Sequence, residues 1–104
     1  MKNHTAKINL MVVLLAFLLS GVAHAGNPGE GAKKYNRYCT GCHGSGGRGA
    51  IPGVPDFTRG EGLLQSDIGL LSVLKAGKGM MPAFMGRMNE TEMLDVIAYL
   101  RTLR

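Results

Sequence analysis

The chain has 104 residues with 12 Lys and Arg, seven Asp and Glu, and a formal net charge of +5. Residues 26–104 alone contain ten Lys and Arg and seven Asp and Glu, so their net charge is only +3. The chain is mildly basic and has no basic run longer than Lys33-Lys34, so it lacks the clusters of Lys and Arg that are typical of nucleic-acid-binding proteins. These 79 residues make one small domain, near the size at which a hydrophobic core alone is marginal.

Residues 1–25 have the features of a secretory signal. Lys2 and Lys7 precede an unbroken apolar run over residues 10–19, and the small-residue frame Ala23-His24-Ala25 follows. We expect cleavage before Gly26, which would leave residues 26–104 in the periplasm without a transmembrane span. The apolar run is too short to cross a bilayer, which takes about 20 residues. A retained interfacial anchor and a nearby alternative cut are the other interpretations.

A first helix is predicted over about residues 30–38, with an apolar side made by Ala32, Tyr35 and Tyr38. Gly31 is costly inside a helix. It fits either a close approach by another helix or a place in the fraying first turn.

The segment 41–62 is predicted to be a loop, because it contains eight glycines and two prolines. It lacks the Gly-Lys-Ser/Thr ending and the preceding strand of a phosphate-binding loop. Backbone that passes close to a large flat ligand explains the glycines better.

Two further helices complete an all-α domain. Ser66-Asp67 is predicted to cap a helix that ends at Gly77, and a second loop follows over residues 78–87. Asn89 and Glu92 have the spacing of a capping box, which predicts a last helix over about residues 90–102. The apolar stripe of that helix is made by Met93, Val96, Ile97, Leu100 and Leu103.

The chemistry of the chain is concentrated in Cys39-Thr-Gly-Cys42-His43, the spacing of a covalent haem-attachment site. Two thiols three positions apart can each add to one haem vinyl group, and the adjoining imidazole then ligates the iron. All cysteines of the chain, and the only histidine of residues 26–104, lie in this segment. The predicted cofactor is therefore one covalent haem c with its iron.

Three other interpretations of the cysteines are weaker. A structural zinc site needs four Cys or His ligands, and residues 26–104 contain only three, Cys39, Cys42 and His43, which lie too close together in the chain to form a closed site. A thioredoxin-type dithiol needs a βαβ setting that the chain does not show. A plain disulfide would staple only a tiny loop.

No second histidine remains to be the other axial ligand, so methionine is expected. The candidates in residues 26–104 are Met80, Met81, Met85, Met88 and Met93. Most of these are expected to be apolar filler. Met81 stands out because Pro82 biases it toward extended backbone, and Met80 is the second choice.

The sequence resembles the class I cytochromes c, in particular the small bacterial and photosynthetic ones. The resemblance covers most of residues 29–103. It rests on Gly31, Tyr35 and Cys39 at four-residue spacing, the haem-attachment motif, the segment Gly79-Met80-Met81-Pro82-Ala83-Phe84, and the segment Asp95-Val96-Ile97-Ala98-Tyr99-Leu100. It implies the cytochrome c fold, with about three to four helices around one covalently bound haem. The loop over residues 44–62 matches no single subfamily closely.

The resemblance also implies roles for individual residues. The methionine of the Met-Pro-x-Phe segment is the distal ligand in this family, which favours Met81 over Met80. A proline carbonyl accepts the Nδ1 hydrogen of the haem-binding histidine, so Pro55, or else Pro52, is expected to orient His43. Gly31 and Tyr35 are expected to cross the last helix near Val96 and Tyr99.

With His43 and Met81 as axial ligands, the expected function is single-electron transfer in the periplasm rather than catalysis. The alternatives are a haem subunit of an exported dehydrogenase or oxidase complex, and a five-coordinate haem that binds or transforms a small ligand. Redox proteins are the expected partners, with no nucleic acid. Lys33, Lys34, Arg48, Lys75 and Lys78 are candidates for a basic rim that steers acidic partners.

Overall fold

The computed structural model describes residues 2–18 and 26–104. In these residues the structure is helical: α1 (Lys2–Leu18), α2 (Pro28–Tyr38), α3 (Thr40–His43), the 3₁₀ helix η1 (Phe57–Arg59), α4 (Asp67–Ala76) and α5 (Glu90–Arg101). Strands are absent from this part of the chain, which has only two isolated bridges, Lys78 with Met81 and Met85 with Met88. The all-α prediction is therefore confirmed.

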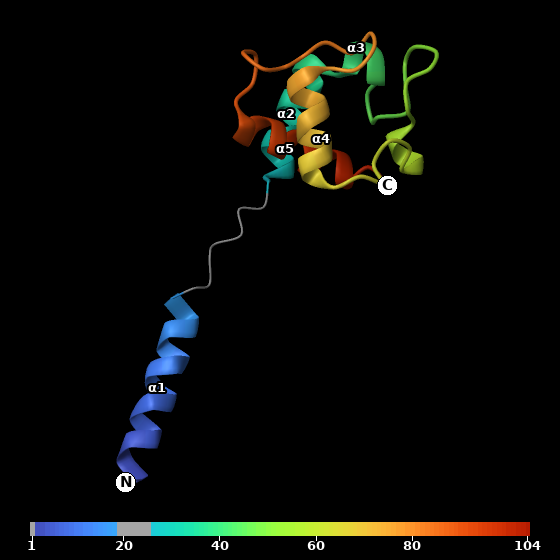
Figure 1. Ribbon diagram of the computed structural model, residues 1–104. Helices are drawn as coiled ribbons and strands as arrows, with labels where there is room; N and C mark the ends of the chain where they lie inside the picture. Colours follow the sequence, from blue (N-terminus) through green and yellow to red (C-terminus); the bar gives the residue numbers. More distant parts are fainter. Residues whose placement is uncertain (1, 19–25) are drawn as a thin grey trace.

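Helix α1 covers much of the predicted signal segment and is drawn apart from the other helices in Figure 1. The large apolar side chains of its middle are all exposed; Ile8 and Met11, for example, are 61% and 71% accessible. Within the described residues, no helix has both the length and the apolar character needed to span a membrane. The predicted cleavage after Ala25 lies outside the described residues.

Helices α2 and α5 lie against each other (Figure 1). Gly31 lies at their contact. A Cβ atom on Gly31 would lie 1.9 Å from the carbonyl oxygen of Asp95 and 2.9 Å from the backbone nitrogen of Val96. One turn further along, the rings of Tyr35 and Tyr99 lie 5.1 Å apart between centroids. Of the two explanations of Gly31, close approach by another helix is therefore the right one.

The helix ends follow the capping signals of the sequence. Asn89 and Glu92 form the predicted capping box, and the Ser66 hydroxyl accepts the Gly69 amide at the start of α4. Helix α2 begins at Pro28 rather than Glu30, because the Asn27 side chain accepts the amides of Gly29 and Glu30 and caps the helix two residues earlier.

The predicted loop over residues 41–62 is partly helical. Its start belongs to α3, and η1 lies near its end. Phe57 of η1 joins the core that α2, α4 and α5 enclose, together with Tyr35, Cys39, Leu63, Leu70, Leu71, Leu74, Phe84, Met88, Met93, Val96, Ile97 and Leu100. Cys39 of the haem-attachment motif and both Phe84 and Met88 of the 77–88 loop therefore belong to the same core.

Candidate haem-binding site

The haem-attachment motif forms a single helical turn. Helix α3 starts directly after Cys39, whose backbone nitrogen still donates to Tyr35 at the end of α2. Cys39 is buried and Cys42 is exposed, and both are free thiols. Burial, with a smaller contribution from Cys42, raises the pKa of the Cys39 thiol to about 11.

The backbone after α3 folds back onto the haem-attachment turn. The carbonyl oxygen of Cys42 accepts the Ala50 amide at 2.9 Å, and that of His43 accepts the Gly49 amide at 2.7 Å. The Gly44 carbonyl oxygen accepts the Tyr35 hydroxyl at 2.7 Å. The last two carbonyl groups of α3 are thus satisfied by the loop, and the carbonyl group of Gly44, which follows the helix, is satisfied by a side chain.

The His43 ring is fixed on one side by stacking. It lies 4.8 Å from the Phe57 ring between centroids, at an interplanar angle of 25°. Burial lowers the pKa of His43, which favours the neutral imidazole that binds a metal.

The Nδ1 atom of His43 is buried and has no hydrogen-bond partner among the described residues. The bond to the Pro55 carbonyl that the family resemblance implies is therefore not formed in this structure, and neither is one to Pro52. The role of Pro55 stays a prediction. A buried nitrogen without a partner is unusual outside functional sites.

The structure separates the five methionines of residues 26–104 into three groups. Met80 and Met85 are exposed, with 93% and 66% of their surfaces accessible, and Met88 and Met93 are core residues. Met81 is partly buried and packs against the cluster that contains Cys39. The predicted ligand Met81 and the predicted covalent anchor Cys39 therefore lie against the same hydrophobic cluster.

A tight turn orients Met81. The backbone groups of Lys78 and Met81 exchange two hydrogen bonds of 3.0 Å, and the exposed Met80 lies at the tip between them. Gly77 packs against this turn: its Cβ would lie 2.6 Å from the Met81 carbonyl oxygen and 2.8 Å from the Ala83 nitrogen. The sequence identified Gly77 only as a helix end, and nothing in its pattern pointed to this contact.

The side chains fit a covalently bound haem better than a bare metal ion. In residues 2–18 and 26–104, no group of three or more His, Cys, Asp and Glu side chains is placed to hold a metal ion. Two unpaired thiols and an imidazole with a buried, unpartnered nitrogen on one helical turn are the donors of a covalent haem site.

Comparisons with known proteins show the family to which the chain belongs. Residues 26–100 match the family described as "Cytochrome C oxidase, cbb3-type, subunit III". Cytochrome c6 of a Synechococcus species is 32% identical over 103 residues, which cover 95% of this chain and 90% of that protein. Cytochrome c6 of a Nostoc species is 28% identical over 103 residues and covers similar shares.

The fold is also similar to that of a solved cytochrome c6. The structure of cytochrome c6 from the diatom Phaeodactylum tricornutum superposes with a TM-score of 0.59 at 28% identity, covering 74% of this chain and 93% of the diatom protein. The chain belongs to the cytochrome c family. It is a class I c-type cytochrome with one covalent haem c, and an electron carrier rather than an enzyme.

Proposed function

We propose that this cytochrome is an exported single-electron carrier whose haem iron is ligated by His43 and Met81. The burial of the methionines supports the distal ligand. Met81 is the one partly buried methionine of the 77–88 loop, whereas Met80 and Met85 face solvent and Met88 is packed in the core. The turn with Lys78 fixes the backbone of Met81, and Pro82 favours extended backbone at this residue.

In this proposal each residue of the site has a separate task. The haem supplies a one-electron centre with an iron that cycles between ferrous and ferric. Cys39 and Cys42 would hold the haem through thioether bonds, since their thiols can add across its two vinyl groups. His43 supplies a neutral nitrogen ligand, and the soft Met81 thioether favours ferrous iron and raises the reduction potential. If His43 and Met81 both bind the iron, no coordination position would be open to a substrate.

The ligand assignment is tested by far-red absorption of the oxidised holoprotein. The wild type should show the weak sulfur-to-iron band, Met81→Ala should lose it, and the matched control Met80→Ala should keep it. If the wild type lacks the band and binds carbon monoxide readily when reduced, the carrier proposal fails and a ligand-binding haem replaces it.

The structure changes the proposed docking rim. Lys33, Lys34 and Lys75 are each engaged by a carboxylate, namely Glu30 at 2.7 Å, Glu92 at 2.7 Å and Glu90 respectively. Arg48 and Lys78 form no ion pair within the described residues, and their side chains are exposed. Paired cations attract an acidic partner less, so the rim is reduced to Arg48 and Lys78.

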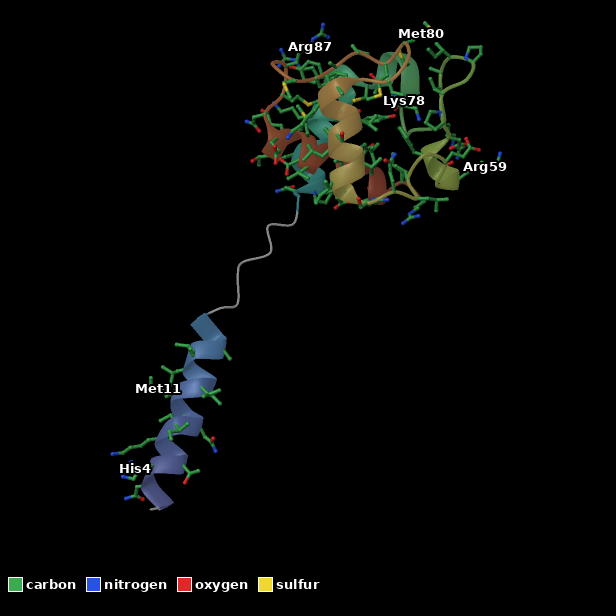
Figure 2. All side chains as sticks on the ribbon, in the orientation of Figure 1. His4, Met11, Arg59, Lys78, Met80 and Arg87 are labelled. Carbon is green, nitrogen blue, oxygen red and sulfur yellow. The ribbon has the colours of Figure 1, made fainter. Side chains whose placement is uncertain are left out.

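A neighbouring arginine extends this reduced rim. Figure 2 shows Lys78, Met80 and Arg87 at the same end of the domain. Arg87 is exposed and, in the part of the chain that the structure describes, unpaired. We therefore propose that acidic redox partners dock over the 77–88 loop, guided by Lys78 and Arg87 around the exposed Met80.

Salt dependence tests this docking surface. The rate of reduction by an acidic partner should fall with ionic strength in the wild type, and less steeply in Lys78→Glu and Arg87→Glu. The control Lys33→Glu makes the same change of charge in α2, outside the 77–88 loop, and should resemble the wild type. Equal salt dependence in all four proteins would remove the 77–88 loop from the docking surface.

A second function, a fixed subunit of an exported oxidase, is favoured by the description of the matching family. The similarity to cytochrome c6 favours a free carrier, because the match covers 90% or more of the length of the two cytochrome c6 proteins named above. Mild solubilisation of cells that produce the full chain separates the two. A free carrier should be released as a small protein with an N-terminus at Gly26, whereas a subunit should stay with an oxidase.

A further inference from the structure

We propose that the Tyr35 hydroxyl is a positioning group for His43, acting through the turn over residues 44–47 and the Phe57 ring. This inference rests on the proposed ligation of iron by His43. It concerns only the phenolic hydroxyl of Tyr35. The packing of the Tyr35 ring against the last helix was already implied by the family resemblance.

The Tyr35 hydroxyl is a buried donor with one defined acceptor. The side chain is 0% exposed, and its hydroxyl donates to the Gly44 carbonyl oxygen at 2.7 Å. Burial, together with Cys39 and Tyr99, raises the pKa of Tyr35 to about 12, so the hydroxyl keeps its proton at neutral pH. Gly44 directly follows His43, so this bond ties the middle of α2 to the end of the haem-attachment turn.

A chain of contacts leads from this bond to the imidazole ring. The Gly44 carbonyl also accepts the Gly47 amide at 3.2 Å, and the Gly47 carbonyl accepts the Phe57 amide at 2.8 Å. Gly47 is buried against Phe57, since a Cβ on Gly47 would lie 3.2 Å from that side chain. The Phe57 ring then stacks on His43.

The side-chain donor matters because the other partners of this turn are backbone amides. The carbonyl oxygens of Cys42 and His43 accept the backbone amides of Ala50 and Gly49. Any sequence with this backbone would supply these amides. Without the Tyr35 hydroxyl, the Gly44 carbonyl would keep only the longer bond from Gly47. Loss of a buried hydrogen bond should make opening of the 44–47 turn about fivefold more frequent.

The Nδ1 atom of His43 adds no support to the orientation of the ring in this structure. This atom is buried and unpartnered among the described residues. In this structure the orientation of the ring therefore depends on the Phe57 stack and on the backbone to either side, more than in a site where a hydrogen-bond acceptor fixes the ring.

The test is Tyr35→Phe in the holoprotein, with Tyr99→Phe as the matched control. Tyr99 packs its ring on Tyr35, and its hydroxyl makes no hydrogen bond within the described residues. Two readouts are used: the haem-methyl shifts of the oxidised protein, which report the orientation of the axial imidazole plane, and amide exchange at Phe57. Tyr35→Phe should rearrange the methyl shifts and speed exchange about fivefold, while Tyr99→Phe should match the wild type.

Each outcome decides the proposal. Methyl shifts unchanged in Tyr35→Phe, or changed equally in both variants, would overturn it. If Tyr35→Phe yields no holoprotein, Phe57→Leu takes its place: rearranged shifts support the proposed route, and unchanged shifts overturn it. A wild type without the sulfur-to-iron band but with His43-dependent methyl shifts would contradict the Met81 proposal and leave this inference standing. Spectra that show no His43 ligation would overturn both.

Discussion

The carbonyl oxygen of Asp95 occupies the space that a side chain at Gly31 would need, because a Cβ there would lie 1.9 Å from it. The same aspartate accepts the Asn27 amide through its carboxylate at 2.7 Å. Helix α5 therefore fixes both the cap and the second turn of α2, directly upstream of the haem-attachment motif.

Gly31→Ala should destabilise the protein despite the better helix propensity of alanine. The contact is with backbone atoms, which cannot move aside as a flexible side chain can, so the helices must separate at a cost of about 2 kcal/mol or more. Urea unfolding of the holoprotein measures it. The control is Gly69→Ala in α4, where the new Cβ would meet mainly the flexible Gln65 side chain; there we expect no loss, or a gain of up to about 1 kcal/mol.

The sequence predicted the elements whose signals are local. The cap made by Asn89 with Glu92, the cap made by Ser66, the end of α4 at Gly77 and the spacing of the haem-attachment motif each depend on residues within a few positions. Their physical causes, hydrogen bonds to free helix ends and the reach of two thiols, act over the same short range. The helix bounds of α4 and α5 were accordingly predicted to within one residue.

Features that depend on distant partners were not predictable. The two explanations of Gly31 could not be separated until α5 was in place beside it. Lys34 and Lys75 looked like free surface cations, but they pair with Glu92 and Glu90, which lie 58 and 15 positions away. Phe57 stacks on His43, and the Tyr35 hydroxyl donates to Gly44, because of the path of a glycine-rich loop that no sequence pattern specifies.

Gly77→Ala should weaken the ligation of iron by Met81. Gly77 has a φ of +76° and a ψ of 173°, a conformation nearly restricted to glycine, and its Cβ would collide with the Met81 carbonyl at 2.6 Å. The turn must shift, so the sulfur-to-iron band should shrink or disappear at neutral pH. The control Gly79→Ala also has a positive φ, but its Cβ would meet nothing within 4 Å. A full band in Gly77→Ala would show that Met81 tolerates displacement of its turn.

Arg101→Lys should destabilise the domain by about 2 kcal/mol, because a lysine cannot reproduce the forked contacts of the guanidinium group. Arg101 donates to the carbonyl oxygens of Leu63 and Gln65, the latter at 2.7 Å, and to the Asp67 carboxylate at 2.9 Å. It thereby holds the residues before α4 against α5. Thermal unfolding of the holoprotein measures the loss, with the exposed Arg104→Lys as control; equal melting temperatures of the two variants would contradict this role.

Protonation of Glu92 should make the protein less stable in acid. The Lys34 hydrogen bond, then the Asn89 amide, lower the pKa of Glu92 from its ordinary 4.5. The unfolded chain therefore binds the proton more readily, so the stabilisation is complete above about pH 4.5 and is lost as pH falls through the lowered pKa.

Glu92→Gln keeps an oxygen for the capping box but no charge. The difference in melting temperature between about pH 6 and about pH 3 should thus be smaller in Glu92→Gln than in the wild type. Glu30→Gln, which removes only an exposed pair with Lys33, should keep the wild-type difference.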